Sequence, residues 1–268
     1  NVNRIKCLNS RGLLAVNDIS FELCKGEILG IAGISNNGQE ELAEALMGLR
    51  KIISGSIEFK GKDITNNNTR SIKEMGCGHI PDDRYAEGCA LQATIRENLI
   101  SENYYKNPLS GKFWMNKPQI IKFTNNLIHT YDVRTLDPDI SMASLSGGNI
   151  QKAIVAKEMT IAKDLLIAEQ PSRGIDIGAT TNIHQEIMNM RNRGCGILLI
   201  STELSEILFL STRILVIFEG KIVGECKPDE TTEEELGLLM AGVNNKKTGL
   251  SHGHKKASNL KSVNNREL

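Results

Sequence analysis

The hydrophobic pattern of the chain changes between the two-residue period of a strand and the 3.6-residue period of a helix. Residues 13–23 alternate in part between apolar and polar side chains, which is typical of a strand in an antiparallel sheet. Residues 27–32 form a short apolar run that ends at Gly33. Beyond the next loop, apolar residues recur at helical spacing, at Leu42, Ala45, Leu46 and Leu49. A strand, a glycine-bearing loop and a helix are therefore predicted here.

The rest of the chain alternates between short apolar runs and longer amphipathic segments. Further strands are predicted at 55–60, 76–80, 164–168 and 195–201, and a strand pair around a Glu-Gly turn within 211–225. Helices are predicted at 94–100, 117–131, 178–192 and 231–241, and directly after residue 148. Strands that alternate with helices predict an α/β fold with a mainly parallel sheet.

The loop GISNNGQE, residues 33–40, stands where a phosphate-binding loop is expected. Gly33 and Gly38 match the first and last glycines of that pattern. Gln39 replaces its lysine, and Glu40 replaces the Ser or Thr that binds Mg²⁺. Gln39 carries no charge, and Glu40 repels phosphate unless it turns away or binds through a metal. Weak nucleotide binding is predicted for Gly33, Ser35, Asn36, Asn37, Gly38, Gln39 and Glu40; a plain strand-turn-helix unit is the alternative.

A second glycine-rich segment, LSGGNIQK at 145–152, places Ser146, Gly147 and Gly148 at the mouth of a predicted helix. Backbone N–H groups and the helix dipole favour an anion there. A bare Ser-Gly-Gly is more often an ordinary helix cap. The full octapeptide, followed by DLLIA at 164–168 and EQPSRGID at 169–176, resembles the signature, Walker B strand and D-loop of ABC-transporter ATPases.

The resemblance covers about residues 1–242, and it implies a P-loop core with an antiparallel β subdomain and a helical subdomain inserted at about 90–162. In this family two ATPase domains pair head to tail, and each signature closes over the nucleotide of the other. The resemblance therefore implies that the partner's ATP is contacted by Ser146, Gly147, Gly148, Asn149 and Asp176.

The positions that act on the domain's own nucleotide depart from the family pattern. Alignment on Pro171 puts Glu169 at the metal-binding position and Gln170 at the general-base position, where an amide cannot accept a proton from water. Thr202 stands at the position of the switch histidine. Asp82, in IPDDRYAEG, can reach a cation, so Glu169 and Asp82 are the Mg²⁺ candidates; a Pro-Asp-Asp turn is the alternative for Asp82.

The changes fall at positions that act on the domain's own nucleotide, while the signature residues and Asp176 are kept, and this pattern implies a function. It resembles the second ATPase half of tandem importers for sugars or nucleosides, nearest the nucleoside (basic-membrane-protein-associated) branch. ATP and Mg²⁺ are expected to bind weakly or not at all in this half's own site. The implied partners are another ABC ATPase domain, membrane permease subunits and, indirectly, a solute-binding protein, at the cytoplasmic face of the cell membrane. A non-hydrolysing structural pseudo-ATPase and a translation-associated ABC protein are the alternatives.

Composition changes this picture little. The 32 basic and 32 acidic residues balance, so no nucleic-acid partner is expected. Residues 245–268 hold six Lys or Arg and one Glu, and residues 243–268 are expected to be a disordered basic tail. The six cysteines lack metal-site spacing and are expected to be reduced thiols. No apolar run approaches the ~20 residues of a membrane span.

Two further features concern the ends and surface of the chain. Asn1 is not an initiator Met, so the chain is expected to be part of a longer protein. The segment 104–118 combines lysines with Tyr104, Tyr105, Phe113 and the only Trp. This composition suits a contact with a protein and a surface loop folded on itself equally well.

Overall fold

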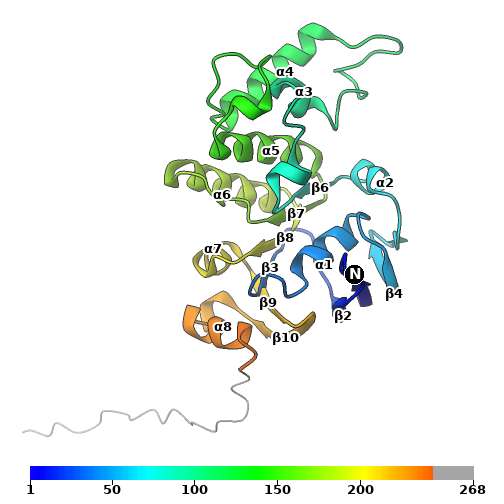
Figure 1. Cartoon of the computed structure of the whole chain (residues 1–268), viewed down its shortest axis with the longest axis vertical. Coiled ribbons are helices and arrows are strands. Elements are labelled where there is room, and N and C mark those ends of the chain that lie inside the picture. Colours follow the sequence, from blue (N-terminus) through cyan, green and yellow to red (C-terminus); the bar gives the residue numbers. More distant parts are fainter. Residues whose placement is uncertain (244–268) are drawn as a thin grey trace, which may run out of the picture.

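A six-stranded sheet forms the centre of the computed structural model, which describes residues 1–243 (Figure 1). Its strands lie in the order β10-β9-β3-β8-β7-β6, and β10 pairs with β9 in the antiparallel sense while the other pairs are parallel. The strands are β3 (Ile28–Ala32), β6 (Cys77–Ile80), β7 (Leu165–Glu169), β8 (Gly196–Ser201), β9 (Arg213–Phe218) and β10 (Lys221–Cys226). Every residue of β3 and β8 is buried, which explains their continuous apolar runs.

A separate four-stranded antiparallel sheet has the order β2-β1-β4-β5. It consists of β1 (Val2–Leu8), β2 (Leu14–Phe21), β4 (Ile52–Phe59) and β5 (Lys62–Asp63). The inward residues of this sheet share one hydrophobic core with α1 (Gln39–Leu46) and with one face of the parallel sheet. The antiparallel sheet therefore supports the helix that follows the loop at 33–40.

Helices form the other layer and the upper part of the molecule in Figure 1. The upper part contains α3 (Ile95–Ile100), α4 (Lys117–Thr130) and α5 (Gly147–Ile161). The remaining helices are α2 (Thr69–Glu74), α6 (Ile177–Asn192), α7 (Leu204–Leu210) and α8 (Glu233–Met240), with short helical turns at Arg84–Gly88, Met142–Ser144 and Pro228–Glu230. One large core joins α5 and α6 to the second face of the parallel sheet.

The predicted fold class is confirmed: the structure has a mainly parallel sheet, an antiparallel sheet and a group of helices. The three helices of the upper part fall within 90–162, the range expected for the helical subdomain. Two helices that were not predicted, α2 and α7, have six and seven residues, too few for a clear helical period. The expected basic tail lies outside the described residues except for Val243.

Across residues 1–243, none of the helices is both long enough and apolar enough to cross a membrane.

Candidate functional site

The loop at 33–40 closes around one of its own side chains. Gln39 Oε1 accepts a hydrogen bond from the Asn37 backbone N–H at 3.0 Å, and Gln39 Nε2 donates to the Ile34 carbonyl at 3.0 Å. A β-carbon at Gly33 would overlap Gln39 Nε2, so only glycine leaves room for this side chain. Gly38 has a φ of 100° and is the N-cap residue of α1. The amide of Gln39 therefore occupies a backbone donor that a phosphate would otherwise use.

Glu169 lines the pocket beside this loop and is paired with the buried His79. His79 Nε2 lies 2.7 Å from Glu169 Oε1, and both residues are almost fully buried. Burial raises the pKa of Glu169 to about 7, although the His79 contact acts in the opposite direction. Glu169 lies at the end of β7 and His79 in the adjacent β6, so parallel pairing brings them together.

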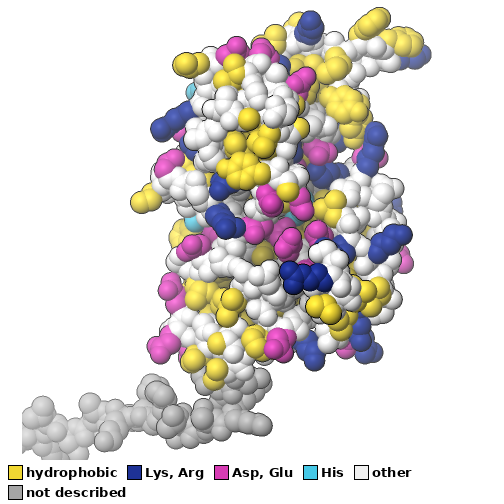
Figure 2. All heavy atoms as spheres, in the orientation of Figure 1, with side chains coloured by type: hydrophobic (Ala, Val, Ile, Leu, Met, Phe, Trp, Pro, Cys, Tyr) yellow, Lys and Arg dark blue, Asp and Glu magenta, His cyan; other side chains and the backbone are white. Residues whose placement is uncertain are grey.

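Acidic side chains line a pocket between the loop at 33–40 and the carboxyl ends of β7 and β8. Burial and the nearby carboxylate of Glu41 raise the pKa of Glu40. The pocket has a volume of about 70 Å³ and includes Glu40, Asp82 and Glu169 in its lining. Figure 2 shows acidic side chains gathered at the middle of the drawn face. A site with a closed loop, no lysine and several carboxylates fits a triphosphate poorly.

Gln170 and Thr202, predicted for the general-base and switch positions, contact each other. Gln170 Nε2 donates to Thr202 Oγ1 at 3.1 Å, and the Thr202 N–H donates to Gln170 Oε1 at 3.3 Å. Gln170 adopts a left-handed backbone with a φ of 47°. The two residues thus use their hydrogen-bonding groups on each other at the carboxyl ends of β7 and β8, where ligands of parallel sheets bind.

Asp82 is engaged in an ion pair. Its Oδ1 accepts from Arg173 Nη1 at 2.7 Å, and both side chains are substantially exposed. Among residues 1–243, no group of three or more His, Cys, Asp or Glu side chains is placed to hold a metal ion. The expectation that Glu169 and Asp82 bind Mg²⁺ stays a prediction.

The signature residues lie at the start of α5. Ser146 is the N-cap residue, and the helix begins at Gly147. Ser146 Oγ accepts from Asn149 Nδ2 at 3.0 Å and is exposed, while Gly147, Gly148 and Asn149 are half-buried. Backbone N–H groups of the first turn of a 15-residue helix are therefore available here beside an accessible hydroxyl. This arrangement fits an anion.

The D-loop packs directly against this helix mouth. A β-carbon at Gly148 would lie 3.1 Å from the Gly174 carbonyl oxygen. Asp176 caps α6 through a 3.0 Å hydrogen bond from the Ala179 N–H, which lowers the pKa of Asp176. Lys152, buried in α5, lies 3.6 Å from Asp176 Oδ2. The structure thus brings together the predicted signature and D-loop residues.

Arg84 connects the same elements, and sequence reasoning assigned it no role. Its Nη1 donates to the Gly147 carbonyl at 3.1 Å and to the Arg173 carbonyl at 3.4 Å. Asp83 caps the helical turn Arg84–Gly88, which contains Arg84, by accepting from the N–H groups of Tyr85 at 2.9 Å and Ala86 at 3.0 Å. The only sequence signal was that Arg84 belongs to the segment IPDDRYAEG.

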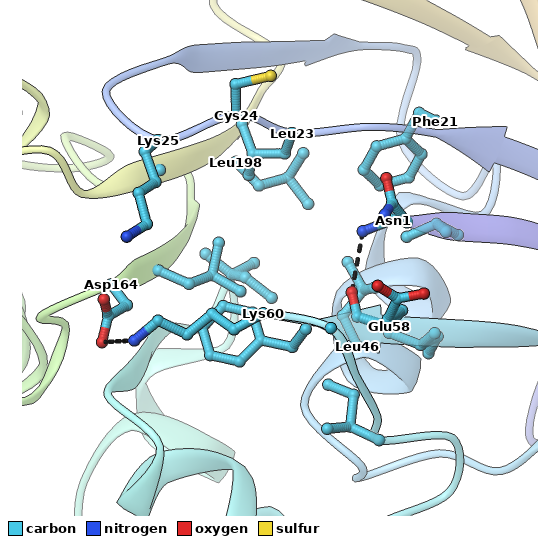
Figure 3. A pocket seen from close by; sticks show the side chains of 18 residues that line it. Asn1, Phe21, Leu23, Cys24, Lys25, Leu46, Glu58, Lys60, Asp164 and Leu198 are labelled. Atoms are coloured by element: carbon cyan, nitrogen blue, oxygen red, sulfur yellow. Dashed lines mark hydrogen bonds and ion pairs between the residues drawn. The ribbon is translucent and has the colours of Figure 1, made fainter.

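A different cavity, of about 270 Å³, lies at the amino-terminal edge of the parallel sheet. Its walls are mostly apolar, and Lys60 forms an ion pair with Asp164 across one side at 2.6 Å (Figure 3). None of the predicted site residues lines it. The candidate chemistry therefore lies at the opposite edge from this larger cavity.

Comparison with known proteins gives consistent matches. The sequence model of the ABC transporter family matches residues 16–173. The guanosine import ATP-binding protein NupO of Bacillus subtilis is 47% identical over 94% of this chain and 49% of its own length. The nucleoside import ATP-binding protein NupA of Lactococcus lactis is 46% identical over 91% of this chain and 49% of its own length. The chain thus spans about half the length of these relatives.

Sugar importers and solved structures match as well. The glucose import ATP-binding protein TsgD13 of Haloferax volcanii is 35% identical over 89% of this chain and 44% of its own length. A dimeric bacterial ABC transporter cassette superposes with a TM-score of 0.74 at 16% identity, covering 85% of this chain and 97% of that one. At that identity the likeness shows the fold alone.

Proposed function

Because the chain belongs to the ABC transporter family, we propose that it is the second ATPase half of a nucleoside importer. In this role it supplies Ser146, the amides of Gly147 and Gly148, and Asp176 to ATP held mainly by another ATPase domain. Its own loop at 33–40 binds ATP and Mg²⁺ weakly or not at all.

The observation that supports this role is the contrast between two glycine-bearing helix mouths. At α1, the side chain of Gln39 occupies the Asn37 N–H and the pocket beside it is acidic. At α5, Ser146 is exposed, and in the described structure its side chain makes no cap hydrogen bond to the backbone. One mouth opposes an anion and the other accommodates it, which suits a domain that serves its partner's nucleotide.

The solute class rests on the relatives. Two relatives at 46–47% identity are named for import of guanosine or nucleosides, and the sugar importer TsgD13 follows at 35%. We extend the nucleoside class to this protein, together with permease subunits, an indirect solute-binding partner and a position at the cytoplasmic face of the membrane.

Reconstitution of the complete transporter in proteoliposomes tests the proposal. ATP-dependent uptake of labelled guanosine that exceeds uptake of glucose and ribose is the expected result. Uptake of a sugar but not a nucleoside would overturn the solute class. Co-purification with ribosomes in place of permease subunits would overturn the transport role, and transport that is indifferent to a signature substitution would indicate a structural pseudo-ATPase.

A further inference from the structure

The segment between α3 and α4 forms a projecting hairpin. The Gly111 N–H donates to the Trp114 carbonyl at 2.9 Å, and Ser110 and Met115 form an antiparallel bridge. Phe113 is 79% exposed and Trp114 is 85% exposed, so two large aromatic side chains face solvent. Figure 1 shows this part of the chain projecting at the upper right, beside α3 and α4.

The base of the hairpin is anchored. Leu109 is buried in a small core with Ile100 and Ile120. The Asn116 N–H donates to the Leu109 carbonyl at 2.8 Å, and Asn116 Oδ1 accepts from the Gln119 N–H at the start of α4. The aromatic tip is therefore held outward by its base.

The charge around the tip has one sign. Residues 103–131 contain four Lys and no Asp or Glu, although the chain as a whole is neutral. Lys112 Nζ lies 5.5 Å from the centre of the Phe113 ring. On α4, Lys117 and Ile121 are four residues apart and both exposed, so the first turns of the helix continue the same surface. Figure 2 shows hydrophobic and basic side chains together at this projection.

We propose that the hairpin 110–116 and the first turns of α4 bind the surface of a lipid bilayer that contains anionic headgroups. Trp and Phe favour the membrane–water interface, where the ring lies among acyl chains and headgroups. Lysines around them attract anionic lipid, and their long stems let the ammonium groups reach phosphate. A convex, acid-free tip complements a negatively charged surface. This contact goes beyond the import function and does not depend on which solute is carried.

Trp114 is the only Trp of the chain, so its fluorescence reports on this site alone. The experiment mixes the full chain with vesicles of phosphatidylcholine, with or without phosphatidylglycerol, and records Trp emission and its quenching by lipids brominated on their acyl chains. We expect a blue shift and quenching that require the anionic lipid and weaken with salt. Binding to vesicles through the basic residues 245–268 alone would appear as co-sedimentation without the blue shift and quenching of Trp114, and this outcome would overturn the proposal.

Paired variants keep Trp114 as the probe. Lys112→Ser is expected to weaken anionic-vesicle binding about fivefold in the emission titration, and Phe113→Ser to weaken binding and reduce the blue shift. Phe209→Ser, which removes another exposed phenylalanine on α7, is the matched control and should have no effect. Unchanged Trp emission in wild-type protein would overturn the proposal. A shift that requires permease subunits, without quenching by brominated lipid, would assign the surface to a protein partner and also overturn it.

Discussion

Gln170 donates from Nε2 to Thr202 Oγ1 across 3.1 Å, so the two residues nearest the expected point of hydrolysis are hydrogen-bonded to each other. Neither group can take a proton from water at neutral pH. The bond also orients the Gln170 carbonyl oxygen toward the Thr202 N–H, at 3.3 Å. Neither of these two positions therefore supplies a general base.

ATP hydrolysis by the chain alone is expected to be at least ~10²-fold slower than hydrolysis by an ordinary ABC ATPase, because Gln170 and Gln39 stand at the positions predicted for the general base and the loop lysine. Phosphate release by the purified chain measures this. Gln170→Glu alone should not restore activity, since Gln39 still lacks the lysine charge. A rate near that of an ordinary ABC ATPase would contradict the assignment of these positions.

In the complete transporter, substitutions in the signature segment are expected to reduce ATPase activity more than substitutions in the loop at 33–40. Gly148→Asp places a carboxylate at an anion-binding helix mouth and close to the Gly174 carbonyl, so solute-stimulated ATPase activity should fall by ~10²-fold or more. Gln39→Ala should reduce it only about 2- to 5-fold, since this loop already lacks a lysine. Gly237→Asp, where a β-carbon meets open space, is the control for folding. Equal damage from Gln39→Ala and Gly148→Asp would show that the domain uses its own site.

The loop at 33–40 can be tested by introducing the Lys and Ser of the phosphate-binding pattern at Gln39 and Glu40. Gln39→Lys with Glu40→Ser restores a cationic side chain and removes a carboxylate from the pocket, so affinity for a fluorescent ATP analogue with Mg²⁺ should rise about 10-fold or more. Glu41→Ser removes the same charge one residue further along α1 and should give no such gain. If wild-type protein binds at micromolar concentration regardless of Mg²⁺, the closed loop does not oppose nucleotide.

Much of the candidate site follows from residue types at known spacing. The octapeptide at 145–152 predicted a helix directly after residue 148, and α5 begins two residues earlier, at Gly147. The buried strand ending near Glu169 was also expected, because apolar runs and glycines act on local conformation. Backbone placement of the signature and of the loop at 33–40 was therefore within reach of sequence reasoning.

The side-chain contacts of the candidate site could not be predicted from the sequence. The return of Gln39 onto Asn37 depends on a rotamer choice, and a glutamine has several. The bond from Arg84 to Gly147 joins residues 63 apart in sequence, and no periodicity encodes it. The sequence predicted His79 only as one residue of an apolar strand. The parallel pairing of β6 with β7 in the structure places it beside Glu169.

The His79–Glu169 pair predicts a pH effect on stability. The pKa of Glu169 is raised to about 7 by burial, above its ordinary value of 4.5, so the folded state favours the protonated carboxyl. Its contribution to stability is full below about pH 4.5 and is lost as pH rises through 7. Glu169→Gln does not titrate, so its stability relative to wild type should rise by roughly 1–3 kcal/mol between pH 5 and pH 8.

Urea unfolding of both proteins at several pH values measures this difference. The amide keeps a hydrogen-bonding partner for His79, so the comparison isolates the charge. Glu203→Gln changes an exposed carboxyl and serves as the control. A difference between wild type and Glu169→Gln that does not change with pH would show that the buried carboxyl is ionised throughout.

Arg84 is expected to act as a positioning residue for the signature. Its two hydrogen bonds to carbonyls hold the start of α5 against the D-loop, and loss of such charged bonds typically costs ~1–2 kcal/mol. Arg84→Ala should therefore lower ATPase activity of the complete transporter about 5- to 30-fold, mainly in kcat, because the helix mouth loses its alignment. Arg191→Ala removes a half-buried arginine in the last turn of α6 and should leave activity unchanged. Arg84→Lys keeps the charge but not the planar fork, so it should recover only part of the loss. Full activity in Arg84→Ala would mean that packing of Gly148 against Gly174 is sufficient to align the two elements.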